Sequence, residues 1–408
     1  MQLPSKVSEL ITTLNNSGHE AYAVGGCVRD ALMGRTPGDF DITTSATPNE
    51  VKALFRRTVD IGIAHGTVTV LVGRNSYEVT TFRQDGIYLD NRRPSSVTFT
   101  ASLQDDLSRR DFTMNAVAYH PAIGYVDPFG GAADIAASSI KCVGEPSRRF
   151  GEDALRLLRA VRFSAQLGFA IQPDTYAALC HQAPTIANVS AERIRVELAK
   201  LLVSSGSERF SDLISSGLWQ AIDPLSLAYF ESNFPTAKPL LKACNDNLCN
   251  RLSLLMQSMS DTEVLRLLKR LKFDNQTMKI VRALINGLRQ NTAPDAYSVR
   301  KALSEHGRDT MENILYLQHI IAASNKDSHE CCRLAEIHRQ VVKILDDKDA
   351  YTISALAVNG NALMQMGLGQ GEQIGQTLQY LLDQVCRDPS KNRPDELKKL
   401  ARQFNACK

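Results

Sequence analysis

Apolar residues along the first 145 positions fall into short runs that glycines interrupt. The clearest run, residues 66–73, reads GTVTVLVG and is rich in β-branched residues. Runs of this kind predict strands, whereas apolar residues three or four apart predict helices. The elements expected here are strands at 21–24, 39–44, 66–73 and 77–83, and helices at 48–56 and 108–118.

From about residue 150 onward, apolar residues recur at the spacing of a helix face. The helices predicted there are 152–168, 173–181, 191–203, 262–272, 276–288 and 299–307, with one or two more in 359–386. Few strand signals follow residue 150. A mixed head that contains a β-sheet, followed by a long and mostly α-helical remainder, is typical of the α+β class.

The composition excludes several classes of protein. The chain has 408 residues, a formal net charge of +3, 43% hydrophobic and 22% charged residues, which excludes a disordered or low-complexity chain. Its apolar runs are shorter than the roughly 18 residues of a membrane helix, so we expect no membrane association. Met1–Gly18 is polar, unlike a signal peptide, and the nine cysteines are scattered. We therefore expect reduced thiols and a cytoplasmic location.

Two aspartates, Asp39 and Asp41, are the first candidates for chemistry. On a strand, this spacing would direct both carboxylates to one face and Phe40 to the other. Close carboxylates repel each other unless a cation lies between them, and Mg²⁺ prefers one or two carboxylates together with substrate phosphates. The pair is therefore predicted to be catalytic and to hold one or two Mg²⁺ ions for phosphoryl transfer.

A glycine pair, Gly25-Gly26, stands between a predicted strand and a helix expected to begin near Cys27. Glycine lets a phosphate approach the backbone closely, and the N–H groups at a helix N-terminus attract anions. Arg29 lies about one turn into that helix and could reach the same phosphates. Each feature alone is typical of a solvated turn. Their combination with the two aspartates favours a nucleotide site.

Three motifs, taken in order, resemble one family. They are Val24–Asp30 (VGGCVRD) with Gly38–Asp41 (GDFD), Arg109–Ala116 (RRDFTMNA), and Glu152–Phe163 (EDALRLLRAVRF). Together they are similar to the branch of the polymerase-beta superfamily that contains class II CCA-adding tRNA nucleotidyltransferases and bacterial poly(A) polymerases. The similarity is tight over residues 20–205 and weakens over 220–350. It returns over 358–375 in a way that resembles the Gram-positive type of CCA-adding enzyme.

The resemblance implies a domain plan and a set of ligands. The implied domains are a nucleotidyltransferase head at 1–145, a helical neck with the base-recognition motif at 146–205, a helical body at 206–330 and a helical tRNA-binding tail at 331–408. The implied partner is tRNA, with CTP and ATP as substrates and Mg²⁺ as cofactor. Arg110, Arg159 and Arg162 correspond to the family's nucleotide-contacting arginines, and Gly26, Arg29 and Arg110 would cradle the triphosphate.

The third motif is also predicted to read a base. Asp153, Arg156, Arg159 and Arg162 step three apart along the polar half of the predicted helix. Such a face is more often a solvated surface with i,i+3 ion pairs. An Asp beside an Arg, however, presents an acceptor next to donors. That order complements the amino donor and ring acceptor of C or A, and it clashes with the reversed order on U or G. Asp153 and Arg156 are therefore predicted to select the base, supported by Arg159 and Arg162.

Three features leave two interpretations open. Glu78, on the predicted strand 77–83, is either a third carboxylate of the site or an exposed strand residue. The polar loop 84–96, with Asp90–Arg93, either helps the site change from C to A addition, as a loop does at this place in the family, or is an ordinary surface loop. The stretch Arg266–Lys301 has nine basic and two acidic residues. It either contacts RNA phosphates or forms solvated helix faces.

We predict a template-independent nucleotidyltransferase that adds CCA to tRNA 3′ ends with release of pyrophosphate. One alternative is the same chemistry with another product, either A addition only or poly(A) synthesis. The other is a non-catalytic RNA-binding protein with a relic head. Gly66–Val70 and the C-terminal glycine motifs resemble the CCA type more than the first alternative, and both aspartates are present, which disfavours the second. The sequence leaves the oligomeric state open, with a homodimer as one option.

Overall fold

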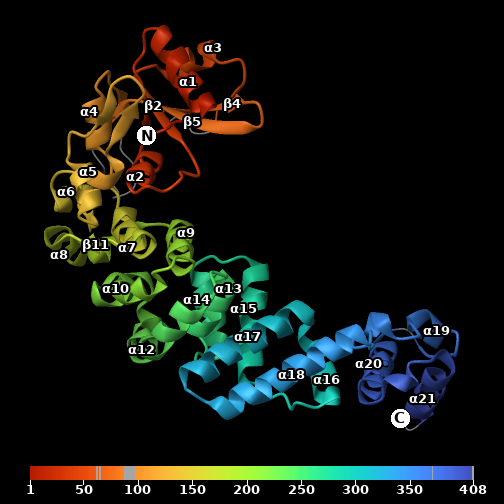
Figure 1. Cartoon of the computed structure of the whole chain (residues 1–408). Coiled ribbons are helices and arrows are strands. Elements are labelled where there is room, and N and C mark those ends of the chain that lie inside the picture. The colour runs from red at the N-terminus through yellow and green to blue at the C-terminus, as the bar shows by residue number, and fades with distance from the viewer. Residues whose placement is uncertain (61–62, 64–65, 87–96, 370, 407–408) are drawn as a thin grey trace. The chain divides into compact units, whose positions relative to one another are not determined.

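The computed structural model describes residues 1–60, 63, 66–86, 97–369 and 371–406. The predicted loop element Asp90–Arg93 lies outside these described residues. The chain forms two compact units (Figure 1). The N-terminal unit comprises Met1–Phe234 with Arg270–Lys272, and the C-terminal unit comprises Pro235–Lys269 with Phe273–Lys408. The boundary falls inside one helix, α12 (Leu227–Ala243). The finer division into four domains stays a prediction.

The N-terminal unit begins with a mixed sheet of seven strands in the order β3-β4-β5-β2-β1-β8-β9. These strands are β1 (Ala21–Val24), β2 (Asp41–Thr44), β3 (Thr58–Val59), β4 (Thr67–Val72), β5 (Asn75–Thr81), β8 (Ala118–His120) and β9 (Gly124–Val126). Strands β1 and β2 are antiparallel, whereas β2 and β5 are parallel. Two small ladders pair β6 (Arg83–Asp85) with β7 (Val97–Phe99), and β10 (Ser139–Ile140) with β11 (Ala170–Ile171).

Apolar side chains cover both faces of this sheet. Helix α1 (Ser5–Asn16) buries Val7, Leu10, Ile11 and Leu14, which share one helix face, against one side of the sheet. Alternate residues of β1 point to opposite sides, so its alanines join this cluster while Tyr22 and Val24 join a second one. Figure 1 shows α1 and α3 (Pro48–Leu54) together beside β4 and β5.

Further helices follow the strands in this unit. They are α2 (Gly26–Leu32), α4 (Leu103–Ser108), α5 (Gly131–Ala136), α6 (Pro146–Glu152), α7 (Leu155–Leu167), α8 (Pro173–Gln182), α9 (Ala191–Leu202), α10 (Phe210–Ser215) and α11 (Leu218–Ile222). The predicted helix at 108–118 is wrong, because α4 ends at Ser108 and only a single 3₁₀ turn, Thr113–Asn115, follows. Phe112 is extended there and forms a β-bridge with Cys142, so no helix can run through it.

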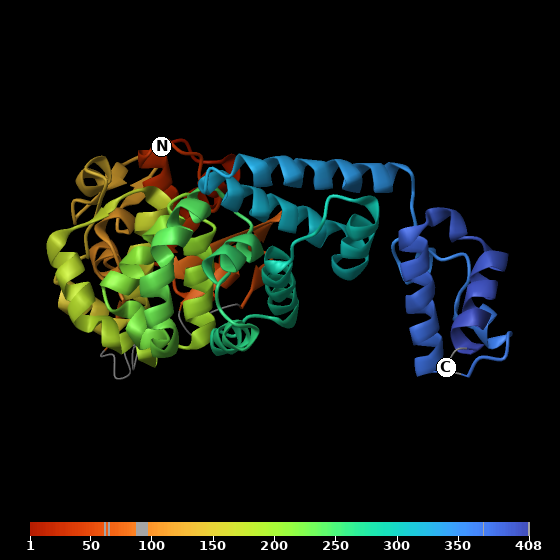
Figure 2. The ribbon, with the colours of Figure 1, turned by 90° about the horizontal axis from the view of Figure 1, so that it is seen from below.

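The C-terminal unit is helical throughout its described residues. Its helices after α12 are α13 (Leu248–Leu255), α14 (Asp261–Arg270), α15 (Asn275–Arg289), α16 (Ala296–His306), α17 (Arg308–Ser324), α18 (Ser328–Asp346), α19 (Gly360–Met364), α20 (Glu372–Arg387) and α21 (Pro394–Ala406). Helices α17 and α18 lie side by side along their length (Figure 2). A mixed sheet followed by helices confirms the predicted α+β class. No helix among the described residues is both long and apolar enough to cross a membrane.

Candidate active site

The middle of the sheet brings the two parts of the first motif together. Asp41 is the first residue of β2 and pairs with Val24 of β1 on one side and with Glu78 of β5 on the other. The expected strand at 39–44 is shorter than predicted, because Asp39 precedes β2. The prediction that strand alternation aligns the two carboxylates is therefore wrong, because Asp39 is not part of the strand. The position of Asp39 comes instead from the irregular segment between α2 and β2.

Asp39, Asp41 and Glu78 nevertheless all line one cavity of about 750 Å³. This volume lies within the range of ordinary small-molecule sites. Glu78 is exposed on its strand and also lines the cavity, so both interpretations of this residue describe part of its setting. The strand register, which joins Asp41 to Glu78, was the information that the sequence did not provide.

The carboxylates repel one another in this arrangement. Burial raises the pKa of Asp41, Arg110 lowers it, and the negative charges of Glu78 and Asp39 raise it further. A bound cation would relieve this repulsion. Across the described residues, no three His, Cys, Asp or Glu side chains converge closely enough to hold a metal ion by themselves. The donor set thus fits a divalent ion that also takes oxygen ligands from a substrate's phosphates, as Mg²⁺ does.

The first residue of the glycine pair lies directly beside Asp41. Gly25 has φ +78°, a conformation that favours glycine, and it ends β1 just before α2 begins at Gly26. A Cβ atom on Gly25 would lie 3.1 Å from Nη1 of Arg110 and 3.9 Å from Oδ2 of Asp41. The glycine loop, the second-motif arginine and the metal-binding carboxylate predicted from the sequence therefore meet at one point.

Arg110 has an unsatisfied donor at this point. Its Nε atom is buried and has no hydrogen-bond partner within the described part of the chain. Its nearest ion-pair partner is Asp106, with 3.5 Å between Nη2 and Oδ2. Burial lowers the pKa of Arg110, and the carboxylates of Asp106 and Asp41 counter that effect. A half-buried arginine with a free, buried donor is suited to bind an anion such as a phosphate.

Arg29 is held more tightly than the sequence suggested. It is buried, and its guanidinium donates to Asp30 at 2.7 Å and to Oδ1 of Asn115 at 2.8 Å. Asn115 in turn donates to Asp111 at 3.0 Å. Arg29 therefore links α2 to the second motif, and its predicted contact with a triphosphate stays a prediction.

The base-recognition motif differs from the predicted continuous helix. Glu152 is the last residue of α6, and Asp153 follows it in an extended conformation (φ −139°, ψ 106°). Helix α7 begins only at Leu155. The prediction that Asp153 shares a helix face with the arginines is therefore wrong. Its Oδ1 instead accepts a hydrogen bond from the Leu155 N–H at 3.1 Å, and its Oδ2 accepts one from Nη2 of Arg193 at 2.9 Å.

Arg156 is buried, contrary to the solvated face that is the common alternative. Its Nη1 donates to Glu152 at 2.6 Å and to the carbonyl of Arg149 at 2.8 Å. Its Nη2 donates to the carbonyl of Arg109 at 2.9 Å, which joins the third motif to the second. The guanidinium is thus fixed in one orientation.

The two remaining arginines of α7 each have a carboxylate partner. Arg159 donates twice to Oδ2 of Asp111, from Nε at 2.8 Å and from Nη2 at 2.6 Å, and Arg162 pairs with Glu197 of α9. Both guanidinium groups lie over the ring of Phe163, at 5.2 and 3.7 Å from its centroid. The partners Asp111, Glu197 and Arg193 were not predicted from the sequence. Asp111 lies inside the second motif, but no local pattern marks the two residues of α9.

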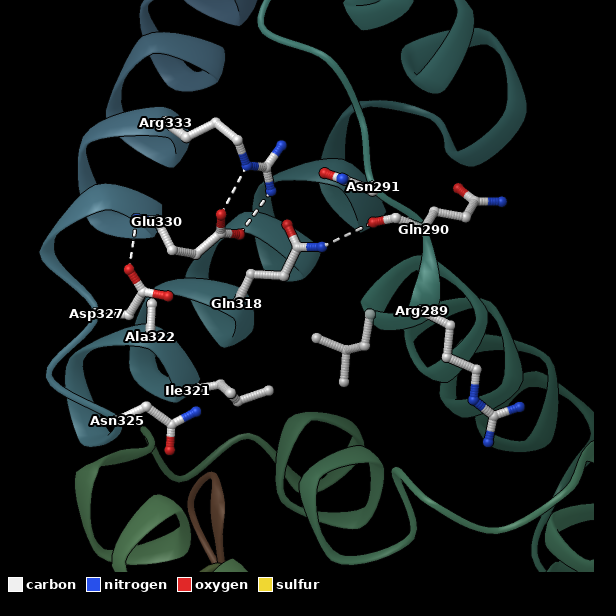
Figure 3. Close-up of a pocket in the computed structure, with 11 residues that line it drawn as sticks. Arg289, Gln290, Asn291, Gln318, Ile321, Ala322, Asn325, Asp327, Glu330 and Arg333 are labelled. Atoms are coloured by element: carbon white, nitrogen blue, oxygen red, sulfur yellow. Dashed lines mark hydrogen bonds and ion pairs between the residues drawn. The ribbon is translucent and has the colours of Figure 1, made fainter.

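The C-terminal unit has a separate cavity of about 300 Å³ between α15, α17 and α18 (Figure 3). Several of its charged and amide side chains contact one another or the helix backbone. Arg333 pairs with Glu330 at 2.6 Å, and Asp327 caps α18 through the backbone N–H of Glu330. Gln318 donates to the carbonyl of Gln290. These contacts describe a junction between helices rather than a ligand site.

The basic stretch Arg266–Lys301 divides into two kinds of residue. Several of its arginines hold helices together, since Arg282 pairs with Asp261 and Arg300 pairs with Asp349, both at 2.7 Å. Its four lysines have exposed side chains: Lys269, Lys272, Lys279 and Lys301. Contact with RNA phosphates stays a prediction, and the exposed lysines are the residues expected to make it.

Three family models match the chain in succession. They are described as "Poly A polymerase head domain" over residues 21–141, "Probable RNA and SrmB- binding site of polymerase A" over 168–227, and tRNA nucleotidyltransferase domain 2 over 248–401. The first includes the glycine pair, both aspartates and the second motif.

Curated relatives match nearly the whole chain. It is 37% identical to a CCA-adding enzyme of Levilactobacillus brevis over 92% of both chains, and 36% identical to one of Lactiplantibacillus plantarum over 98% of this chain and 97% of that one. A crystal structure of the Bacillus stearothermophilus CCA-adding enzyme in complex with CTP matches with a TM-score of 0.82 and 32% identity, over 100% of this chain and 99% of that one. The motifs, the fold and these full-length similarities agree, and the chain belongs to the CCA-adding enzyme family.

Proposed function

We propose that this protein adds C, C and A to the 3′ ends of tRNA, using CTP and ATP and releasing pyrophosphate, without a nucleic-acid template. The observation that carries the proposal is the meeting of Asp41, Gly25 and Arg110 at one end of β1 and β2. Full-length similarity to CCA-adding enzymes supports it, and one such relative has been crystallised with CTP.

The reaction assigned to this site is attack of the tRNA 3′-hydroxyl on the α-phosphate of the nucleotide. Asp39 and Asp41 would hold Mg²⁺. Bound divalent ions neutralise charge on the attacking and leaving oxygens in reactions of this type. Arg110 supplies a positive charge and a free donor for the triphosphate, and the glycine pair lets phosphate oxygens approach the backbone. Gly26 and Arg29 complete the proposed cradle.

Asp153 and Arg156 would select the incoming base. The Asp153 carboxylate accepts hydrogen bonds and the Arg156 guanidinium donates them, which complements the amino donor and ring acceptor of C and A. U and G present their donor and acceptor in the opposite order. Rejection is steep where a wrong ligand leaves buried polar groups unpaired, on the order of 10⁴-fold in sites built for one hydrogen-bond pattern. Arg159 and Arg162 would support the nucleotide from the same helix.

The eight described cysteines are free thiols, which supports the proposed cytoplasmic location.

The experiment offers the full-length protein a tRNA that lacks its last three nucleotides, together with labelled CTP, ATP and Mg²⁺. The expected product gains two C residues and then one A, and a tRNA that already ends in CCA gains nothing. Incorporation of A without C would identify the A-adding or poly(A) alternative. No incorporation at all would support the non-catalytic alternative. The Asp39→Ala variant should lose at least about 100-fold in rate, the scale expected when a preorganised electrostatic group is removed.

A further inference from the structure

Helix α9 supplies charged partners to both ends of the base-recognition motif. Arg193, in its first turn, donates to Asp153 at 2.9 Å. Glu197, one helical turn later, pairs with Arg162. Residues four apart on a helix lie on one face, so a single face of α9 contacts the motif at two places. Helices α7 and α9 pack closely against each other, which fixes this arrangement.

The two pairs differ in burial, and this difference separates their roles. The Arg162–Glu197 pair is buried, with side chains 7% and 6% exposed, so its loss would leave an uncompensated charge in the interior. The Arg193–Asp153 pair is 31% and 20% exposed, and pairs in contact with water contribute little to folding stability. The contribution of this pair to folding stability therefore does not explain why Arg193 lies beside Asp153.

The orientation of the Asp153 carboxylate gives a better reason. One oxygen accepts from Arg193 and the other from the Leu155 N–H, so both oxygens of the carboxylate are held. An ionised carboxylate has about four acceptor positions. These two bonds leave acceptor capacity for the amino group of a base while they fix the plane of the carboxylate. A preorganised acceptor discriminates between bases more sharply than a mobile one.

Arg193 also has unused hydrogen-bonding capacity. Its Nη1 atom is buried and, within the described residues, has no hydrogen-bond partner. Leaving a buried donor unsatisfied is costly, which makes such groups worth a specific explanation. Here the unsatisfied donor belongs to the residue that holds the proposed base-reading carboxylate.

We propose that Arg193 is a specificity-determining positioning residue, which acts through Asp153 to favour C and A over U and G. This inference rests on the proposed base-reading role of Asp153. Arg193 acts by orienting the acceptor that meets the amino group of the base. Its removal should therefore weaken discrimination between CTP and UTP more than it weakens the transfer step itself.

The test compares kcat/KM for CTP and for UTP on a tRNA that lacks its CCA end, using the full-length protein with Mg²⁺. Arg193→Gln should lower the CTP/UTP ratio about tenfold or more, chiefly through a higher KM for CTP. Arg193→Lys, which keeps the charge, should recover part of the ratio. Arg195→Gln is the matched control, because Arg195 lies on the same helix but donates to the carbonyl of Lys272. It should leave the ratio unchanged.

Asp153→Asn separates failure of this inference from failure of the proposed function. If Asp153→Asn changes the ratio and Arg193→Gln does not, Arg193 has no positioning role. An equal loss for CTP and UTP in Arg193→Gln would also overturn the inference, since it would indicate a merely structural effect. If Asp153→Asn itself leaves the ratio unchanged, the base-reading role of Asp153 fails, and the inference fails with it. If Arg193→Gln does not fold, the ratio measured for Arg193→Lys decides between these outcomes.

Discussion

Three carboxylates near the start of β2 place negative charge where it destabilises the ligand-free protein. Asp41 lies beside Glu78 on the neighbouring strand and lines the same cavity as Asp39, and Arg110 offsets the repulsion among these carboxylates. Natural active sites often keep such unfavourable electrostatics because catalysis requires them. The arrangement is consistent with a site whose carboxylates gain their counter-charge when substrate and metal bind.

Replacing Asp41 by Asn should therefore stabilise the metal-free protein at pH 7 by about 1 kcal/mol or less, because solvent screens the charge of this exposed side chain, while it abolishes nucleotide transfer. Because the pKa of Asp41 is raised on folding, its destabilising charge is absent in acid and develops as the pH rises through the folded pKa. The gain should accordingly shrink toward about pH 4, near the ordinary pKa of Asp. Thermal unfolding in a chelating buffer at both pH values measures it.

The control for this change is Glu9→Gln, on an exposed position of α1. It removes one negative charge without altering the site, and its unfolding temperature should stay close to that of the wild type at both pH values. A lower unfolding temperature for Asp41→Asn than for the wild type at pH 7 would show that Asp41 is not electrostatically strained.

At the scale of elements, ion pairs bind α7 to the segments around it. Burial alone would raise the pKa of Asp111, but Arg159 and the Asn115 amide outweigh burial and hold that pKa well below its usual range. Asp111 thus joins α7 to the second motif through Arg159 and, through Asn115, to Arg29 of α2. One carboxylate organises three of the segments that are proposed to form the nucleotide site.

The Asp111→Asn substitution should destabilise the fold by about 2–4 kcal/mol at pH 7. This is less than the roughly 3–5 kcal/mol for a fully buried pair, because the Arg159 side chain is 32% exposed. The lowered pKa stabilises the fold above the unfolded value of about 3.9 and ceases to do so as the pH falls through the folded value. The difference between wild type and variant should therefore decrease in strong acid. Urea unfolding at pH 7 and pH 3 tests this, and a constant difference would contradict it.

A second prediction at this scale concerns the exposed lysines of the C-terminal unit. Lys279 on α15 and Lys301 on α16 are exposed, whereas Arg300 pairs with Asp349. Replacing both lysines by Gln should weaken tRNA binding. The affinity should also depend less steeply on salt concentration, by the amount expected for the loss of up to about two phosphate contacts. The unfolding temperature should not change. Binding titrations over a range of salt concentrations provide the measurement, and an unchanged salt slope would place the RNA elsewhere.

Sequence patterns predicted helices correctly where local signals determine the structure. Helices α8, α9, α14, α15 and α16 lie within a few residues of their predicted bounds, because apolar spacing and capping residues are local signals. The failures occur where a distant partner decides. Asp153 leaves the helix and pairs with Arg193, forty residues away along the chain. Phe112 likewise bridges to Cys142. No periodicity within a single segment contains this information.

At the scale of the whole molecule, the mixed head and the helical remainder followed from the change in apolar spacing near residue 150. The aspartates, the glycine pair and Arg110 were predicted from short motifs, and the structure places Asp41, Gly25 and Arg110 together. The roles of Glu197 and Arg193 could not be predicted, because they depend on how α9 packs against α7. Side chains that orient other side chains are determined by tertiary packing.

The most direct test of the account is a crystal structure of the full-length protein with CTP and Mg²⁺. It should show a metal ion about 2.1 Å from oxygens of Asp39 and Asp41 and of the triphosphate. Arg110 should contact the phosphates, and the amino edge of cytosine should face Asp153 and Arg156. A CTP molecule bound away from both the aspartates and the start of α7 would contradict the account.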